Sequence, residues 1–165
     1  MEEGETTISG YVQCQYLERV EHQKRIWQNV DETVSNETKV TIHGNTVLVP
    51  VTLGYGGSVV QVLLVLDTGA SNTTISAEIA ARLNINLEQA KKVKGQVVGG
   101  GLVEGRRTRL SFITVGPHTR NDMAIDIIEH KGAAVKYDGL LGMDFLRKLK
   151  YQIDFDNRIV KWLPQ

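Results

Sequence analysis

Two apolar runs separated by a glycine turn constrain the fold of this chain more than any other feature. Residues 46–54 (TVLVPVTLG) alternate with a period of two, which is typical of a strand with one buried face. The residues on that face are Val47, Val49, Val51 and Leu53. Residues 58–67 (SVVQVLLVLD) are apolar enough for a central strand, and the YGG between the two runs favours a tight turn. The sequence therefore predicts a β-hairpin.

The chain after residue 39 is predicted to be mostly β throughout. Ser76 can cap a short helix over residues 76–85, in which Ile79, Ala80 and Leu83 share a face. The other predicted elements are a strand, glycine tip and strand over residues 92–116, ended by Pro117; a strand over residues 123–130; a buried strand feeding a short helix over residues 138–149; and a hairpin over residues 151–164 that turns at Asp156-Asn157. We expect a mostly β domain with two short helices.

Residues 11–35 have a different periodicity. Their apolar residues recur at steps of three, four or seven, which suits one face of a helix, and they are Val12, Tyr16, Val20, Trp27, Val30 and Val34. We predict an N-terminal helical extension or linker over residues 1–40 and a main domain over residues 41–165. A coiled-coil partner helix is the weaker alternative, because the pattern is short and irregular.

Composition argues against several classes of function. The 19 basic and 19 acidic residues balance, so the chain has no global electrostatic attraction for nucleic acid or anionic lipid. Cys14 is the only cysteine and the four histidines are scattered, so we expect no metal and no cofactor.

No run approaches the roughly 18 apolar residues of a membrane span, and residues 1–10 lack the regions of a signal peptide. We expect no membrane contact by this segment. We assign no cellular compartment. A periplasmic or membrane-tethered protein would carry its export signal or anchor in a segment before these residues.

The second apolar run ends in a turn that carries a carboxylate, a hydroxyl and a glycine, Asp67-Thr68-Gly69. A lone buried carboxylate is costly unless it is paired or protonated. The Thr68 hydroxyl can bond beneath the turn, and Gly69 permits a backbone path that a Cβ would block. Ala70 and Ser71 are small and leave the turn open. These features suit an exposed catalytic acid on a rigid base.

Three interpretations of this turn compete. Asp and Gly are common in turns, so a purely structural turn is the first. The phosphate loop of actin and the sugar kinases also has Asp-x-Gly after a strand, but that fold needs a second lobe and further nucleotide motifs, which 165 residues cannot hold. The third is a catalytic aspartate, and the rest of the chain favours it.

Three motifs occur in an order that resembles the retropepsin-like aspartic proteases: VLLVLDTGAS, a glycine-tipped hairpin around GGGLVEG, and DGLLGMDFL. The resemblance covers about residues 44–164 and implies an acid-protease β-barrel with a flap hairpin. It implies that Asp67 is catalytic, within a motif completed by Thr68 and Gly69, and that Thr68 bonds across a dimer axis. It also implies that Leu140, Leu141 and Gly142 support the active-site loop.

The same resemblance places the flap at about residues 96–105. The residues expected to contact substrate are Ala70, Ser71, Val98, Gly99, Gly100, Gly101 and Leu102. A dinucleotide-binding G-x-G-x-x-G from Gly99 would need glycine where Glu104 stands, and no long helix follows. A plain flexible loop remains the alternative to a flap.

The chain departs from the viral members of this family at one ion pair. Viral enzymes commonly carry an aspartate two residues past the glycine and an arginine after the late glycine, and Ser71 and Met143 occupy those positions here. Both ends are missing together, so no buried charge is left unpaired. The chain therefore looks closer to the cellular members, especially the bacterial ones.

A single Asp-Thr-Gly motif has a consequence for assembly. The chemistry needs two carboxylates that share one proton, and none of the late acidic residues (Asp138, Asp144, Asp154 and Asp156) stands in such a motif. Asp67 must therefore meet Asp67 of a second copy, so we expect a homodimer that cleaves a peptide or protein substrate. Residues 151–163 and 46–51 are the expected interface strands. The alternative is a catalytically silent dimerisation or peptide-binding module.

Overall fold

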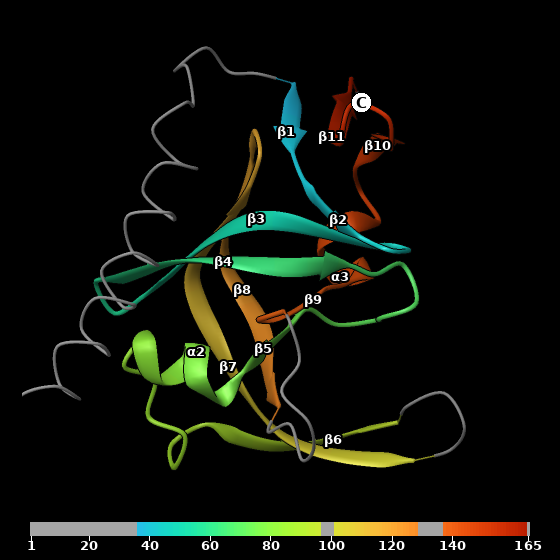
Figure 1. The fold of residues 1–165 in the computed structure, drawn as a ribbon. Helices are drawn as coiled ribbons and strands as arrows, with labels where there is room; N and C mark the ends of the chain where they lie inside the picture. The colour runs from blue at the N-terminus through green and yellow to red at the C-terminus, as the bar shows by residue number, and fades with distance from the viewer. Residues whose placement is uncertain (1–35, 97–100, 129–136, 165) are drawn as a thin grey trace, which may run out of the picture. The chain divides into compact units, whose positions relative to one another are not determined.

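A computed structural model of the chain describes residues 36–96, 101–128 and 137–164. All of them belong to one unit, residues 35–165, which is dominated by strands (Figure 1). The helix predicted over residues 11–35 lies outside the described residues. Most of the predicted glycine tip does so as well.

The strands form a closed barrel and a small second sheet. They are β1 (Glu37–Lys39), β2 (Thr41–His43), β3 (Thr46–Tyr55), β4 (Ser58–Leu66), β5 (Thr74–Ser76), β6 (Lys91–Gln96), β7 (Leu102–Val115), β8 (His118–Ile128), β9 (Gly139–Leu141), β10 (Lys150–Asp154) and β11 (Ile159–Leu163), and the helices are α2 (Ala77–Arg82) and α3 (Met143–Leu146). The larger sheet has the order β2-β3-β4-β9-β5-β8-β7-β6. Because β3 also pairs with β7, the strands from β3 round to β7 close into a barrel. The prediction of a mostly β domain with two short helices is confirmed for the described residues.

The first predicted hairpin is present. β3 and β4 pair antiparallel as far as Tyr55 and Ser58. Gly56 and Gly57 between them have φ of 53° and 88°, the left-handed pair that a two-residue hairpin turn requires and glycine adopts without strain. β4 also pairs in parallel with β9, so it is a central strand, as predicted.

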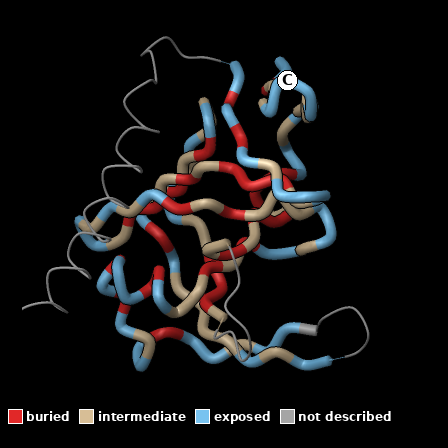
Figure 2. Tube along the Cα trace, viewed as in Figure 1, coloured by how far each residue is buried: buried red, intermediate tan, exposed pale blue. Residues whose placement is uncertain are grey.

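The core lies inside the barrel. Val49, Leu53 and Leu64 have no exposed surface, which confirms the face predicted for β3 and the central position of β4. Figure 2 shows buried residues along the central strands and exposed residues at the hairpin ends. Each buried side chain of this size contributes about 1.5–3 kcal/mol, so this interior is the main source of stability.

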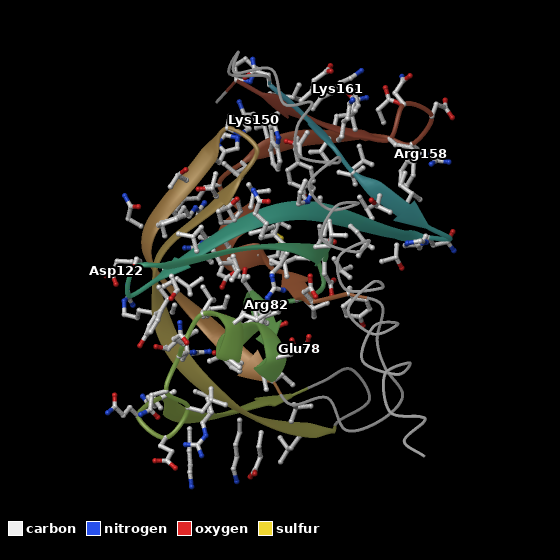
Figure 3. All side chains as sticks on the ribbon, turned by 60° about the vertical axis from the view of Figure 1, so that its left-hand side comes forward. Glu78, Arg82, Asp122, Lys150, Arg158 and Lys161 are labelled. Carbon is white, nitrogen blue, oxygen red and sulfur yellow. The ribbon has the colours of Figure 1, made fainter. Side chains whose placement is uncertain are left out.

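Helix α2 begins as the sequence predicts. The Ser76 side chain caps it by accepting a hydrogen bond of 3.3 Å from Ile79 N. Its apolar face is buried, whereas Glu78 and Arg82 are exposed on its other side (Figure 3). Neither this helix nor any other in the described ranges has the length and apolar character of a membrane span.

A three-stranded sheet of order β1-β11-β10 completes the unit. Trp162 of β11 is only 3% exposed, and its Nε1 donates a hydrogen bond of 2.8 Å to Thr38 Oγ1 of β1. Its ring packs edge to face with His118, at 5.0 Å between centroids, and burial lowers the pKa of that histidine. The predicted C-terminal hairpin is therefore confirmed. β1, which lies in the segment assigned to the N-terminal extension, pairs with it.

The turn of this C-terminal hairpin is held by Asp154. Its carboxylate accepts hydrogen bonds from the side chain and backbone of Asn157 and from Lys161 Nζ. The Asn157 bonds, followed by Lys161, lower the pKa of Asp154 to about 2. Figure 3 shows Lys161 on this sheet, with Arg158 at the turn. The carboxylate thus has a local structural role.

Candidate active site

Asp67 stands directly after the central strand β4, where the chain turns. The last residue of β4, Leu66, lies opposite Leu141 of β9, and Asp67 N donates a hydrogen bond of 3.1 Å to Leu141 O. Gly69 N donates to Asp67 Oδ1 at 2.8 Å, and Ala70 N donates to Asp67 O at 3.3 Å. Asp67 is half-buried. Its carboxylate is therefore fixed by its own turn, on a strand that cannot move without the barrel.

Gly69 is needed for space rather than for backbone conformation. Its φ is not among the positive values in the chain. A Cβ at this position would lie 3.2 Å from Asp67 Oδ1, tighter than nine in ten real Cβ contacts, so the carboxylate would have to move by a few tenths of an ångström. The sequence analysis expected a Cβ at Gly69 to block the backbone path. In the structure, the atom that such a Cβ would displace is a carboxylate oxygen of Asp67.

The residues that follow Asp67 have small side chains, and the backbone of two of them binds the start of α3. Thr68 is exposed, and its hydroxyl has no hydrogen-bond partner within the described ranges. Ala70 O accepts from Met143 N at 2.8 Å, and Ser71 O accepts from Asp144 N at 3.1 Å. The turn is thus open on one side and anchored on the other.

The anchor continues through a fully buried threonine. Thr73 Oγ1 donates to Asp144 Oδ1 at 2.6 Å and accepts from Gly142 N at 3.1 Å. A Cβ on Gly142 would lie 2.5 Å from the carbonyl carbon of Asn72, so the two segments touch directly. The sequence interpretation gave Asp144 no role. An acidic residue one position into a helix, after a glycine that supports the turn, was the available signal.

A second cluster ties the same loop to β7 and β8. Arg107 makes a two-fold ion pair with Asp126, at 2.6 and 2.7 Å, and Asn72 Nδ2 donates to Asp126 Oδ2 at 3.1 Å. Asp126 is 9% exposed, and its hydrogen bond raises the pKa of Arg107. The ion pair of the viral enzymes is absent at Ser71 and Met143, but a different pair holds this loop. Sequence reasoning missed it, although an aspartate inside the apolar strand 123–128 was a signal.

This cluster borders a cavity of about 170 Å³. The residues that line it are Asn72, Arg107, Met123, Ala124, Asp126 and Asp144. The loop after Asp67, the ion pair and Asp144 are therefore neighbours in space, although they come from four segments of the chain.

The predicted glycine-tipped hairpin is formed by β6 and β7. They pair antiparallel up to Gln96 opposite Leu102, and among the described strands β6 pairs with β7 alone, so the two project as an arm (Figure 1). Gly101 is exposed and Leu102 is 71% exposed. The expected contact residues Val98, Gly99 and Gly100 lie outside the described residues. A flap role for this hairpin stays a prediction.

Two further acidic residues of the late part of the chain, Asp138 and Asp156, have other environments. Asp138 Oδ2 accepts from Leu63 N at 2.8 Å, which ties the segment before β9 to β4. Asp156 is exposed in the C-terminal turn. In residues 36–96, 101–128 and 137–164, no group of three or more His, Cys, Asp or Glu is placed to hold a metal ion.

Comparison with known proteins bears on this site. A family model described as aspartyl protease matches residues 49–145. The chain is similar to a retropepsin-like aspartic protease from Rickettsia conorii, with a TM-score of 0.56 and 20% identity over 77% of this chain and 93% of that chain. It is also similar to the retroviral protease-like domain of Ddi1 from Leishmania major, with a TM-score of 0.49 and 23% identity over 74% of this chain and 97% of that chain. No curated protein matches. The first of these likenesses confirms the retropepsin-like fold.

Proposed function

The chain belongs to the aspartyl protease family, and we propose that it is an aspartic endopeptidase whose catalytic group is Asp67. One observation carries the proposal. The Asp67 carboxylate is held by a hydrogen bond from Gly69 N at the end of the central strand β4, in a turn whose other side is open. A bond of this kind also occurs in ordinary Asx turns, so what favours a catalytic role is its place directly after a central strand, inside the segment that matches the aspartyl protease family.

The proposed reaction uses two such carboxylates, one ionised and one protonated. The ionised one takes a proton from a water molecule while the water oxygen bonds to the scissile carbonyl carbon. The protonated one gives its proton to the carbonyl oxygen, which produces a tetrahedral diol. The diol then gives a hydroxyl proton to the second carboxylate as the C–N bond breaks, and the first carboxylate, protonated in the attack, gives its proton to the leaving nitrogen, so the pair again holds one proton. Two like charges side by side are unfavourable, so the pair holds a single proton.

A second copy of the chain supplies the partner carboxylate. Each chain carries one Asp-Thr-Gly, so a two-fold axis beside Asp67 is the economical way to bring two together. The exposed Thr68 hydroxyl, with no partner within the described part of its own chain, supports a bond across that axis. Homodimerisation is thus part of the proposal.

The substrate is an extended peptide or protein segment lying across the two turns. The small side chains of Ala70 and Ser71, and the exposed Gly101 and Leu102 at the base of the hairpin tip, leave room for it. An extended peptide binds by main-chain hydrogen bonds like an added strand. The hairpin tip would close over it and exclude water.

The test compares wild type with Asp67→Asn on a denatured protein substrate across pH. Wild type should cleave with a bell-shaped pH dependence on the acidic side, because only the singly protonated pair is active. Asp67→Asn is nearly isosteric and should fold but not cleave. Glu78→Gln makes the same change from carboxylate to amide on the exposed side of α2 and should cleave as wild type does. Cleavage by Asp67→Asn would refute the assignment, and peptide binding without cleavage by wild type would indicate a silent module.

A further inference from the structure

We infer that Asp144 is a positioning residue for catalysis: it holds the Asp67 turn in its working geometry through Thr73. This inference rests on the proposed function. Asp144 is the second residue of α3 and lies 77 positions after Asp67 in the sequence. Its carboxylate nonetheless binds the segment that continues the turn.

The Asp144 carboxylate accepts four hydrogen bonds from two residues. Thr73 N lies 2.9 Å from its Oδ1 and 2.8 Å from its Oδ2, and Thr73 Oγ1 donates to Oδ1 at 2.6 Å. Phe145 N donates to Oδ1 at 2.9 Å, within the first turn of α3. Hydrogen bonds to an ionised acceptor are stronger than neutral ones. The Thr73 side, with three of the four, is therefore the main contact.

Thr73 depends on this carboxylate. Its residue surface is 0% exposed, so water cannot replace a lost acceptor for its backbone N–H. A buried donor left without an acceptor costs about 1–3 kcal/mol. The chain would relieve that cost by moving the loop, and this loop starts at Asp67.

Three further hydrogen bonds couple a shift of this loop to the position of Asp67. The backbone of the segment that contains Asp144 binds the turn at Asp67 N, Ala70 O and Ser71 O, through Leu141 O, Met143 N and Asp144 N. Asp144 O also accepts a hydrogen bond of 2.7 Å from Arg120 Nη1 on β8, which fixes α3 to the barrel. Asp144 therefore joins residues 141–145 to residues 67–73 through its side chain as well as its backbone.

A purely structural role would give a different result. It would lower the stability of the whole domain and leave kcat of the folded fraction unchanged. A positioning role lowers kcat more than it changes KM, because misplacement of the carboxylate affects the transition state and not peptide binding. Asp138 provides the matched control, since its carboxylate also accepts a backbone hydrogen bond of 2.8 Å, from Leu63 N, without touching residues 67–73.

The experiment measures kcat and KM for wild type, Asp144→Ala, Asp144→Asn and Asp138→Ala. All are assayed on one peptide, at protein concentrations where specific activity no longer rises. Asp144→Ala should lower kcat about 10- to 100-fold with little change in KM. Asp144→Asn should lower kcat less than Asp144→Ala, because its Oδ1 can still accept from Thr73 and Phe145, whereas its amide nitrogen stands where Oδ2 accepts from Thr73 N. Asp138→Ala should keep kcat even where its unfolding temperature falls as far as that of Asp144→Ala.

Amide hydrogen exchange of residues 67–73 gives a readout that does not depend on activity. Asp144→Ala should speed exchange across this segment, Asp144→Asn should speed it less, and Asp138→Ala should not change it. Unchanged exchange or unchanged kcat in Asp144→Ala would overturn the positioning role, and so would an equal loss of kcat in Asp138→Ala.

If wild type itself does not cleave, the proposed function fails, and the exchange measurement alone decides whether Asp144 holds the turn. If Asp144→Ala does not fold, a partial loss of kcat in Asp144→Asn together with a loss in Thr73→Val supports the role, whereas no loss in Thr73→Val refutes it.

Discussion

Asp67 and Gly69 restrain each other within a single turn. Gly69 N donates to Asp67 Oδ1 at 2.8 Å, and a Cβ at Gly69 would lie 3.2 Å from the same oxygen. An added methyl group must therefore push the carboxylate or break the hydrogen bond. We predict that Gly69→Ala lowers kcat by about tenfold or more. The unfolding temperature should change little, because Gly69 is exposed and its φ is not left-handed.

The measurement is peptidase kcat together with thermal unfolding of the same preparations. Gly95→Ala on β6 is the control, because a Cβ there has only Val103 O nearby, at an ordinary 3.9 Å. This control should match wild type in stability. A Gly69→Ala protein with wild-type kcat would show that the carboxylate tolerates the methyl group.

At this scale, sequence reasoning succeeds where the signal is local. Asp67, Thr68 and Gly69 follow an apolar strand directly, so their place at its end could be predicted. The bond between Thr73 and Asp144 could not, because the partners are 71 residues apart and each is a common residue type. Period and motif describe a segment but not which other segment it contacts.

Between elements, the pair of Arg107 on β7 and Asp126 on β8 ties the arm of β6 and β7 to the loop at Asn72. The Asp126 side chain is 13% exposed, and Arg107 is the cation paired with it. We predict that Arg107→Met lowers the free energy of unfolding by about 1–3 kcal/mol, because it leaves a buried acceptor charge without its donor. The double variant with Asp126→Leu should recover part of that loss, since no buried charge remains.

A matched pair lies on the same two strands. Arg109 and Asp122 also meet at 2.6 Å, but their side chains are 60% and 76% exposed. Arg109→Met should change stability little, because exposed ion pairs are screened by water. Denaturant unfolding of the variants distinguishes the two sites. Equal effects of Arg107→Met and Arg109→Met would mean that burial of Asp126 does not matter.

The elements themselves were predictable, and their neighbours were not. Period two and the YGG turn predicted the hairpin of β3 and β4, and Ser76 predicted the start of α2. The parallel pairs β4–β9 and β5–β8 left no trace in the sequence, because a buried strand shows the same apolar run whatever strand lies beside it. Those two pairs are what bring Gly142 and Asp126 to the Asp67 loop.

At the scale of the whole molecule, some apolar residues of the C-terminal hairpin lie in the core and others lie on the surface. Val160 and Trp162 are 0% and 3% exposed and belong to the core of the single chain, whereas Phe155 is 57% exposed. Removal of the C-terminal hairpin would therefore damage the fold as well as any interface. A point change at Phe155 separates the two, because this side chain contributes little to the folded single chain.

We predict that specific activity rises with protein concentration until a dimer saturates, because each chain supplies one Asp67. Phe155→Ser should shift that rise to about tenfold or more higher concentration, since burial of a side chain of this size is worth about 1.5–3 kcal/mol. It should leave the unfolding temperature of the dilute protein unchanged. Val59→Ser removes an equally exposed residue (58%) at the first hairpin and should follow the wild-type curve. Sedimentation equilibrium run beside a dilution series of peptidase rate makes the comparison. A wild-type curve for Phe155→Ser would place the interface elsewhere, and constant specific activity in a strictly monomeric protein would rule out a site shared between two chains.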